Sequence, residues 1–203
     1  MKSKKEKYNL TFAIAFEILL LITAIVNFIN GVKRNGYLSI MSMFLIPVPF
    51  ILSNLADKKD IRLPSSFKVI AILFLFGTQY LGELVGFYFT LWWWDIFLHG
   101  FAGFYMVSVG RDLIKSFIIN EKGINSNRYA FFISLWAFSF STTISTLWEI
   151  FQYIGDSLLN TNMLKEGIKD TFHDLLAGEL LALLGAIVIY LKLRYKKAAL
   201  YKV

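Results

Sequence analysis

Residues 12–29 read FAIAFEILLLITAIVNFI, a long apolar run interrupted by a single acidic residue, Glu17. A helix of about 20 mainly apolar residues is long enough to cross a hydrocarbon core of about 30 Å. The run therefore predicts a membrane-spanning helix over Tyr8–Ile29. A basic start precedes it and no small-residue cleavage pattern follows it, so we interpret it as a signal anchor and not as a cleaved signal peptide.

Further apolar runs of similar length follow along the chain, and turn-forming or charged stretches separate them. Pro47 and Pro49 are expected to bend the second span or to end it early. The loops are too short to separate domains, so we expect one integral membrane domain over residues 1–203, with its motif-bearing half at 92–193. The fold class is all-α, with six predicted spans: Tyr8–Ile29, Tyr37–Leu55, Phe67–Phe89, Trp92–Leu113, Arg128–Ile154 and Thr171–Leu193.

The composition agrees with a polytopic membrane protein. Hydrophobic residues make up 57% of the 203 residues and charged residues only 17%, which is unusual for a soluble domain. The chain has no cysteine, which excludes disulfides and thiolate metal ligands. A net charge of +7 is compatible with nucleic-acid binding, but the basic residues lie in short loops between apolar runs, so no nucleic-acid partner is expected.

The basic residues also predict the orientation. Most of the 21 Lys and Arg residues lie before the first span, after the second, after the fourth and after the sixth. The positive-inside rule then places both termini in the cytoplasm. Only four basic residues fall in the loops on the other side: Lys33, Arg34, Lys165 and Lys169.

With this orientation, polar residues of four spans gather near the outer face and form a polar cup. An ionisable residue in a membrane helix costs roughly 2.5–3.5 kcal/mol, so it is usually retained for a function or a partner. Small residues at Gly100, Gly103 and along 178–186 would allow the helices to pack closely there. The members of the polar cup are Gln79, Glu83, Asp95, His99, Thr142, Ser145, Glu149, Gln152, Asp156, Asp170, His173 and Asp174.

Several carboxylates in one low-dielectric place must share protons, pair with a protonated histidine, or bind a cation. Without cysteine, the Asp, His and Glu side chains would suit Zn²⁺, Mn²⁺ or Mg²⁺. Glu149 is our candidate for the general base that activates a metal-bound water. The predicted metal ligands are Asp95, His99, Asp170 and Asp174. Residues expected to contact these ligands, without binding the metal themselves, are His173, Gln152, Asp156 and Glu83.

Simpler interpretations remain open for these residues. Thr171 and Asp174 match a capping box, which would make them only the start of a helix. Asp95 and Asp170 also lie near predicted helix N-termini, where the helix dipole favours anions. Glu149 would then be a structural hydrogen-bonding residue.

Three functions are consistent with the polar cup. The first is a metal-binding protein or metal-dependent enzyme that acts on a lipid or envelope precursor at the outer leaflet. The second is a module that binds or transports a small solute. The third is a structural or regulatory membrane protein with a buried polar network.

A resemblance is carried by Asp95-x-x-x-His99, by Glu149-x-x-Gln152, and by Asp170-Thr171-x-x-Asp174. In this order the motifs resemble the YjdF-type family of uncharacterised bacterial inner-membrane proteins and are similar to the VanZ-like family. The similarity covers roughly residues 92–186. It implies a multi-pass protein of the bacterial plasma membrane, in contact with the lipid bilayer, in which these motif residues are important. One VanZ-like member is associated with low-level glycopeptide resistance, and the chain departs from the VanZ pattern at Asp174, where an Asn is expected.

Overall fold

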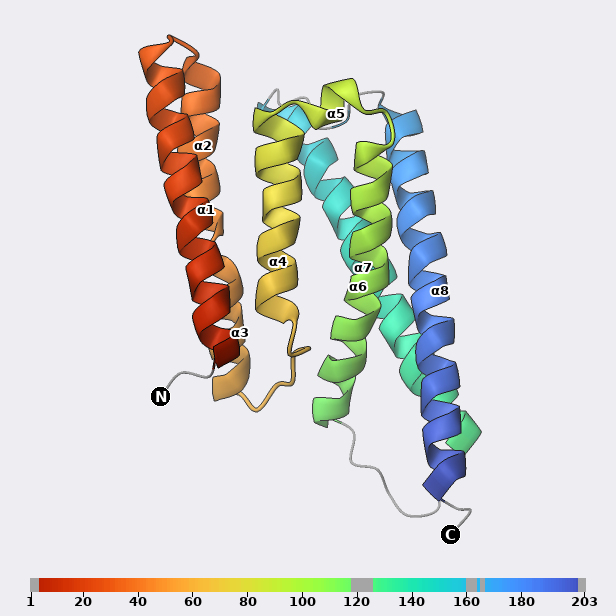
Figure 1. Ribbon diagram of the computed structural model, residues 1–203. Coiled ribbons are helices and arrows are strands. Elements are labelled where there is room, and N and C mark those ends of the chain that lie inside the picture. Colours follow the sequence, from red (N-terminus) through yellow and green to blue (C-terminus); the bar gives the residue numbers. More distant parts are fainter. Residues whose placement is uncertain (1–3, 118–125, 160–163, 165–166, 201–203) are drawn as a thin grey trace. The chain divides into compact units, whose positions relative to one another are not determined.

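The computed structural model describes residues 4–117, 126–159, 164 and 167–200 (Figure 1). These residues are helical apart from short turns, and none of them forms a strand, which confirms the all-α prediction. The basic residues Lys2, Lys122, Lys165 and Lys202, which helped to predict the orientation, lie outside the described residues.

The helices group into two compact units, Met1–Trp94 (unit 1) and Asp95–Val203 (unit 2). The division falls close to residue 92, where the predicted motif-bearing half begins. Each unit has its own buried apolar cluster, so each is described by itself. The single membrane domain over residues 1–203 stays a prediction.

Unit 1 is built around helix α1, whose buried side packs on its neighbours through Phe16 and Leu20. Gly31, with a φ of +75°, allows the chain to reverse direction after α1. Pro47 separates α2 from α3, as the sequence predicts. The helices of unit 1 are α1 (Lys4–Ile29), α2 (Lys33–Leu45), α3 (Val48–Lys58), α4 (Phe67–Leu75), the π-helix η1 (Phe76–Leu84) and α5 (Phe87–Thr90).

The π-helix η1 continues α4 and was not predicted. It contains two members of the polar cup, Gln79 and Glu83. The Gln79 amide oxygen accepts a hydrogen bond of 3.3 Å from the Ser42 hydroxyl, and Glu83 accepts one of 3.0 Å from the Arg34 guanidinium. Both polar side chains therefore have partners within unit 1.

Unit 2 contains three long helices: α6 (Trp94–Phe117), α7 (Ser126–Leu159) and α8 (Ile168–Leu200). Small residues bring them together. A side chain at Gly103 of α6 would collide with the backbone of Gly178 of α8, so only glycine permits this approach. The buried Ser141 of α7 donates a hydrogen bond of 2.8 Å to the Gly103 carbonyl oxygen. The three helices thus meet around Gly103.

Five described helical stretches are long and apolar enough to span a bilayer. Helix α6 is not among them, because Asp95, His99, Arg111 and Asp112 lower its hydropathy, so the six-span count is not confirmed. The five candidate spans are Lys4–Ile29, Lys33–Lys58, Phe67–Leu84, Asn127–Leu158 and Ile168–Tyr195.

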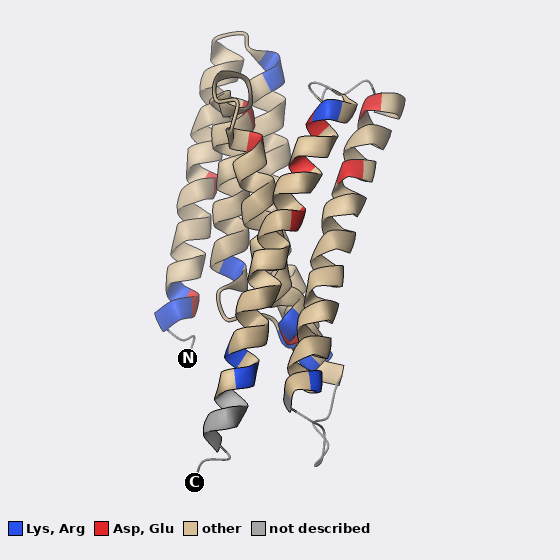
Figure 2. Ribbon diagram, turned by 90° about the vertical axis from the view of Figure 1, so that its right-hand side faces the viewer, with Lys and Arg blue, Asp and Glu red and all other residues tan. Residues whose placement is uncertain are grey.

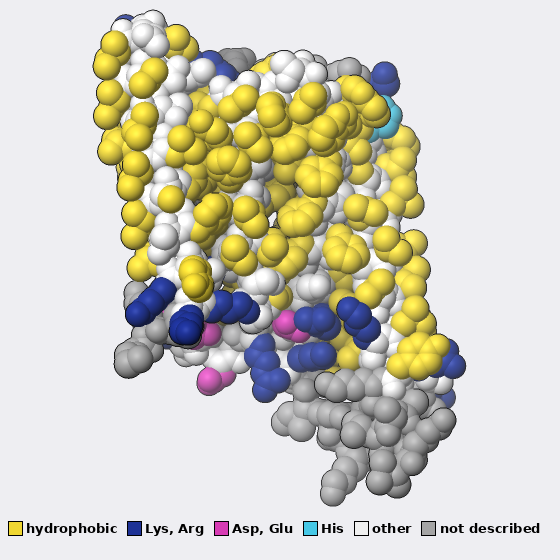
Figure 3. Space-filling view, in the orientation of Figure 1, with side chains coloured by type: hydrophobic (Ala, Val, Ile, Leu, Met, Phe, Trp, Pro, Cys, Tyr) yellow, Lys and Arg dark blue, Asp and Glu magenta, His cyan; other side chains and the backbone are white. Residues whose placement is uncertain are grey.

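The surface fits a bilayer environment. Many large hydrophobic side chains are exposed along these helices, among them Ile18 and Ile22 of α1 and Leu180 and Leu184 of α8. On the face shown in Figure 3, hydrophobic side chains cover the sides of the helices, and Lys and Arg gather at one end. Such exposed apolar area is stable in lipid but not in water.

Candidate metal centre

Helix α6 supplies two members of the site from one face. Asp95 and His99 are four residues apart, which places their side chains one above the other. The Asp95 Oδ1 atom lies 3.6 Å from the His99 Nε2 atom, and both side chains are largely buried. Asp95 is in the first turn of α6, where the helix dipole favours a negatively charged side chain.

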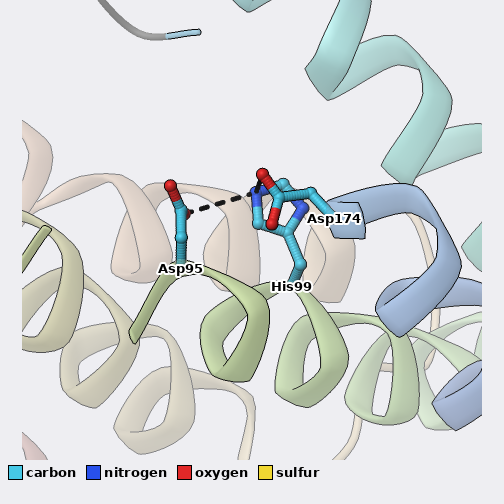
Figure 4. A group of neighbouring side chains, drawn as sticks. All are labelled: Asp95, His99 and Asp174. Atoms are coloured by element: carbon cyan, nitrogen blue, oxygen red, sulfur yellow. Dashed lines mark ion pairs between the residues drawn. The ribbon is translucent and has the colours of Figure 1, made fainter. Parts of the chain in front are cut away.

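Helix α8 brings the third member, Asp174. Its Oδ2 atom lies 3.8 Å from the same nitrogen, His99 Nε2, and its side chain is only 3% exposed. Figure 4 shows the two aspartates approaching the imidazole from α6 and α8. One ligand atom from each of the three residues lies within 4.8 Å of the others. The contact of Gly103 with Gly178, one turn further along both helices, fixes this approach.

Helix α7 places Glu149 on the opposite side of the imidazole. The Glu149 Oε1 atom lies 3.5 Å from His99 Nδ1, and the Glu149 side chain is only 4% exposed. Among the described residues, no donor makes a hydrogen bond to either carboxylate oxygen. The Thr171 hydroxyl lies within interaction range of this carboxylate. The two nitrogens of His99 thus face different carboxylates.

The distances suit a divalent cation. Bonds of about 2.0–2.2 Å in a tetrahedral site put neighbouring ligand atoms roughly 3.3–3.6 Å apart. The separations of 3.6 and 3.8 Å from His99 Nε2 to the two aspartates are close to that range. Two carboxylates and one imidazole suit Zn²⁺ or Mn²⁺, and the two carboxylate charges would neutralise the ion.

The structure brings together four of the predicted residues: Asp95, His99, Asp174 and Glu149. Asp170, the remaining predicted ligand, is half-buried in the first turn of α8 and lies within electrostatic range of Glu149. It is not part of the group of three that can share an ion.

His173 takes no part in this group. Its side chain is exposed, and its ring packs edge-on against Phe172 at a centroid distance of 5.9 Å. The capping-box interpretation is wrong, because α8 begins at Ile168 and so Thr171 lies inside the helix. Asp174 is therefore in the second turn, where a side chain no longer caps the helix.

The predicted polar stripe of α7 faces the interior of unit 2. Gln152 and Asp156 are half-buried next to the buried Glu149, whereas most residues between them are exposed. The Gln152 Oε1 atom is buried and has no hydrogen-bond donor among the described residues. Asp156 accepts a hydrogen bond of 2.8 Å from the backbone N–H of Leu164. Glu83, predicted to support the ligands, belongs to unit 1 and pairs with Arg34.

A second polar contact lies further along the same two helices. The Thr142 hydroxyl of α7 donates a hydrogen bond of 2.6 Å to the Glu179 carboxylate of α8. Glu179 was not among the predicted site residues, although an acidic residue inside a predicted span is a signal for a polar partner. Figure 2 shows acidic residues in the upper parts of α7 and α8, and basic residues toward their lower ends and at the upper end of α8.

A comparison with protein families gives one match. A family model described as "Predicted membrane protein (DUF2238)" matches residues 12–197. The chain belongs to this family. The match covers nearly all of both units and supports a multi-pass membrane protein, without testing a link to the YjdF-type or VanZ-like families. No curated protein and no solved structure matches the chain.

Proposed function

We propose that this protein binds a divalent metal ion through Asp95, His99 and Asp174, and that the bound ion acts on a lipid or envelope precursor. The observation that carries the proposal is the convergence of two aspartates on the same imidazole nitrogen, His99 Nε2. Two carboxylates and one imidazole are a ligand set that divalent cations take, and an ion between them would balance the two carboxylate charges.

The buried Glu149 carboxylate supports a ligand-binding site over a purely structural network. In a purely structural hydrogen-bond network each buried acceptor is paired with a donor, because an unpaired buried polar group costs about 1–3 kcal/mol. Among the described residues, neither Glu149 oxygen accepts a hydrogen bond of good geometry, although the Thr171 hydroxyl lies nearby. A metal on His99 Nε2 leaves the ring proton on Nδ1, which faces Glu149.

Three protein ligands leave at least one coordination position for water or substrate. This arrangement is typical of catalytic zinc sites, in which the ion polarises an oxygen of the substrate or activates a water molecule. Because the helices of unit 2 expose apolar side chains, a lipid-linked substrate would reach the site from the bilayer. In our proposal the site faces the exterior of a bacterial plasma membrane, as the basic loops predict.

Metal content tests the binding proposal. The full chain, purified in detergent, is loaded with Zn²⁺, dialysed and analysed by elemental mass spectrometry. We expect one Zn²⁺ per chain in the parent, and only background in the Asp95→Asn/Asp174→Asn double variant. His173→Asn is the matched control, because it removes an exposed imidazole and should keep the ion. A parent without stoichiometric metal, or a double variant that retains it, would refute the binding site.

Turnover tests the chemical part of the proposal separately. Zn²⁺-loaded parent and Asp174→Asn are reconstituted with a bacterial lipid extract, and the lipids are compared by mass spectrometry. We expect new products only with the loaded parent. Identical lipid profiles for both proteins would limit the site to metal binding.

A further inference from the structure

The geometry points to a fixed division of the His99 imidazole: Nε2 binds the metal, and Nδ1–H is donated to Glu149. Glu149 is then a positioning residue for the ligand and not the general base. This inference rests on the proposed metal site and adds to it the choice of nitrogen and the role of the third helix.

The first support is the placement of the carboxylates around the ring. Both aspartates lie on the Nε2 side, at 3.6 and 3.8 Å, and Glu149 lies on the Nδ1 side, at 3.5 Å. Three carboxylates from three helices thus enclose one imidazole, with two of them on one nitrogen. A metal-binding histidine usually donates its other N–H to a carboxylate or carbonyl, which fixes the tautomer and the ring orientation.

The second support is the distance that separates Glu149 from the open coordination position. An ion on the Nε2 lone pair, with a bond of about 2.1 Å, would lie roughly 6–7 Å from the Glu149 carboxylate. A base that takes a proton from a metal-bound water must be within roughly 2.6–3.2 Å of that water, or act through another water. The imidazole ring itself separates Glu149 from the ion.

The third support is the burial of Glu149. Its carboxylate is only 4% exposed in a membrane helix, where an acidic group is costly unless it has a task or a partner. The Nδ1 edge of His99 lies 3.5 Å from the Glu149 Oε1 atom and can present an N–H group to it. Metal binding at Nε2 makes that N–H a stronger donor, so the ion and the Glu149 carboxylate support each other through the ring.

The chain permits a direct spectroscopic test, because it has only two histidines. In the His173→Asn background, ¹⁵N-histidine labelling reports on His99 alone. We expect the Zn²⁺-loaded full chain to show a metal-bound Nε2 and a protonated Nδ1. A spectrum with the metal on Nδ1 would overturn the inference.

Two substitutions then separate positioning from base catalysis. Glu149→Leu removes the acceptor, and the Kd for Zn²⁺ should rise by about 10–100-fold, the usual effect of losing such a partner. Glu149→Gln keeps an acceptor of the same size and should restore most of the affinity. A general base would leave the Kd for Zn²⁺ unchanged in both variants, and that result would refute the positioning role.

The outcomes distinguish this inference from the proposal beneath it. If the parent itself binds no Zn²⁺, both fail. If the parent binds Zn²⁺ and Glu149→Leu binds it equally well, only the positioning role fails. Circular dichroism of the metal-free variants shows whether Glu149→Leu folds, and Glu149→Gln supplies the tautomer readout if it does not.

Discussion

The contact between α6 and α8 at Gly103 should control the proposed metal site one turn away. In the Gly103→Ala variant, the new Cβ atom would lie 2.9 Å from the Gly178 carbonyl carbon and 3.0 Å from its Cα atom. Non-bonded carbon atoms prefer about 3.5–4.0 Å. Because backbone atoms cannot rotate away, the two helices must separate by roughly 0.5–1 Å.

The same separation of the helices would move His99 and Asp174 apart. His99 precedes Gly103 by four residues, and Asp174 precedes Gly178 by four, so both pairs lie one turn along the same two helices. The distance of 3.8 Å between His99 Nε2 and Asp174 Oδ2 would grow to roughly 4.3–4.8 Å. That is longer than the roughly 3.3–3.6 Å between neighbouring ligand atoms in a tetrahedral zinc site.

To bind the ion, His99 and Asp174 must return to their shorter separation. This forces the two helices together again at the overpacked contact between residue 103 and Gly178. Overpacking costs about 1–3 kcal/mol, which corresponds to a rise of about 5–150-fold in the Kd for Zn²⁺. A competition titration with a zinc-binding dye measures this change. Gly185→Ala on α8 is the control, because its Cβ would lie 3.3 Å from the Phe104 carbonyl oxygen and needs only a small adjustment. Equal affinity in parent and Gly103→Ala would refute the idea that this glycine contact sets the ligand spacing.

Three other perturbations test the remaining parts of the structure. Thr142→Val removes the donor to Glu179 and should lower the free energy of unfolding by about 1.5–3 kcal/mol, measured by denaturant titration in micelles; an unchanged midpoint contradicts the contact. A chelator should lower the melting temperature of the Zn²⁺-loaded parent, because an ion at 100 times its Kd stabilises by about 2.7 kcal/mol; Asp174→Asn should not respond, and an equal shift in both proteins argues against the site. Because the chain lacks cysteine, Asn30→Cys and Lys59→Cys can be labelled individually in intact cells; an impermeant thiol reagent should reach only Asn30→Cys, and the reverse pattern would invert the predicted orientation.

The sequence predicted the part of the site that depends on local spacing. Asp95 and His99 are four apart, and a helical period is enough to place them on one face. The stripe through Glu149 was visible for the same reason, since steps of three and four residues keep a polar row on one side of α7. Both features follow from helix geometry alone, and the structure has both.

The choice between the acidic residues of α8 depends on how this helix packs against α6. The sequence predicted a start at Thr171 and gave both Asp170 and Asp174 as ligands, because residues four apart share one face of a helix. In the structure α8 starts at Ile168, after Gly167 with a φ of +64°. Within the helix, His173 lies at the surface and Asp174 faces His99. The close packing of α6 on α8 at Gly103 and Gly178 brings Asp174, and not Asp170, into the group around His99.

The structure of unit 1 was harder to predict. A π-helix has the same composition as an α-helix, so no sequence pattern in residues 76–84 predicts that η1 is a π-helix. π-helical segments are rare and frequently occur at functional sites. In η1, the changed register lets Gln79 meet Ser42 and places Glu83 beside Arg34. The cup that the sequence analysis assembled from four spans therefore reduces, within unit 2, to three helices around His99.

Two residues of the cluster, together with Arg111 and Asp112, make helix α6 less apolar than an ordinary membrane span. Each ionisable side chain in a span costs roughly 2.5–3.5 kcal/mol; Asp95 and His99 add two of them to α6, and Asp174 adds one to α8. A purely structural helix would gain stability from replacing these residues with leucine, because a well-packed apolar group often outperforms a buried ion pair. The chain instead places two carboxylates on one imidazole nitrogen and a third carboxylate on the other. In our proposal, a divalent cation between the two aspartates offsets the repulsion between these carboxylates.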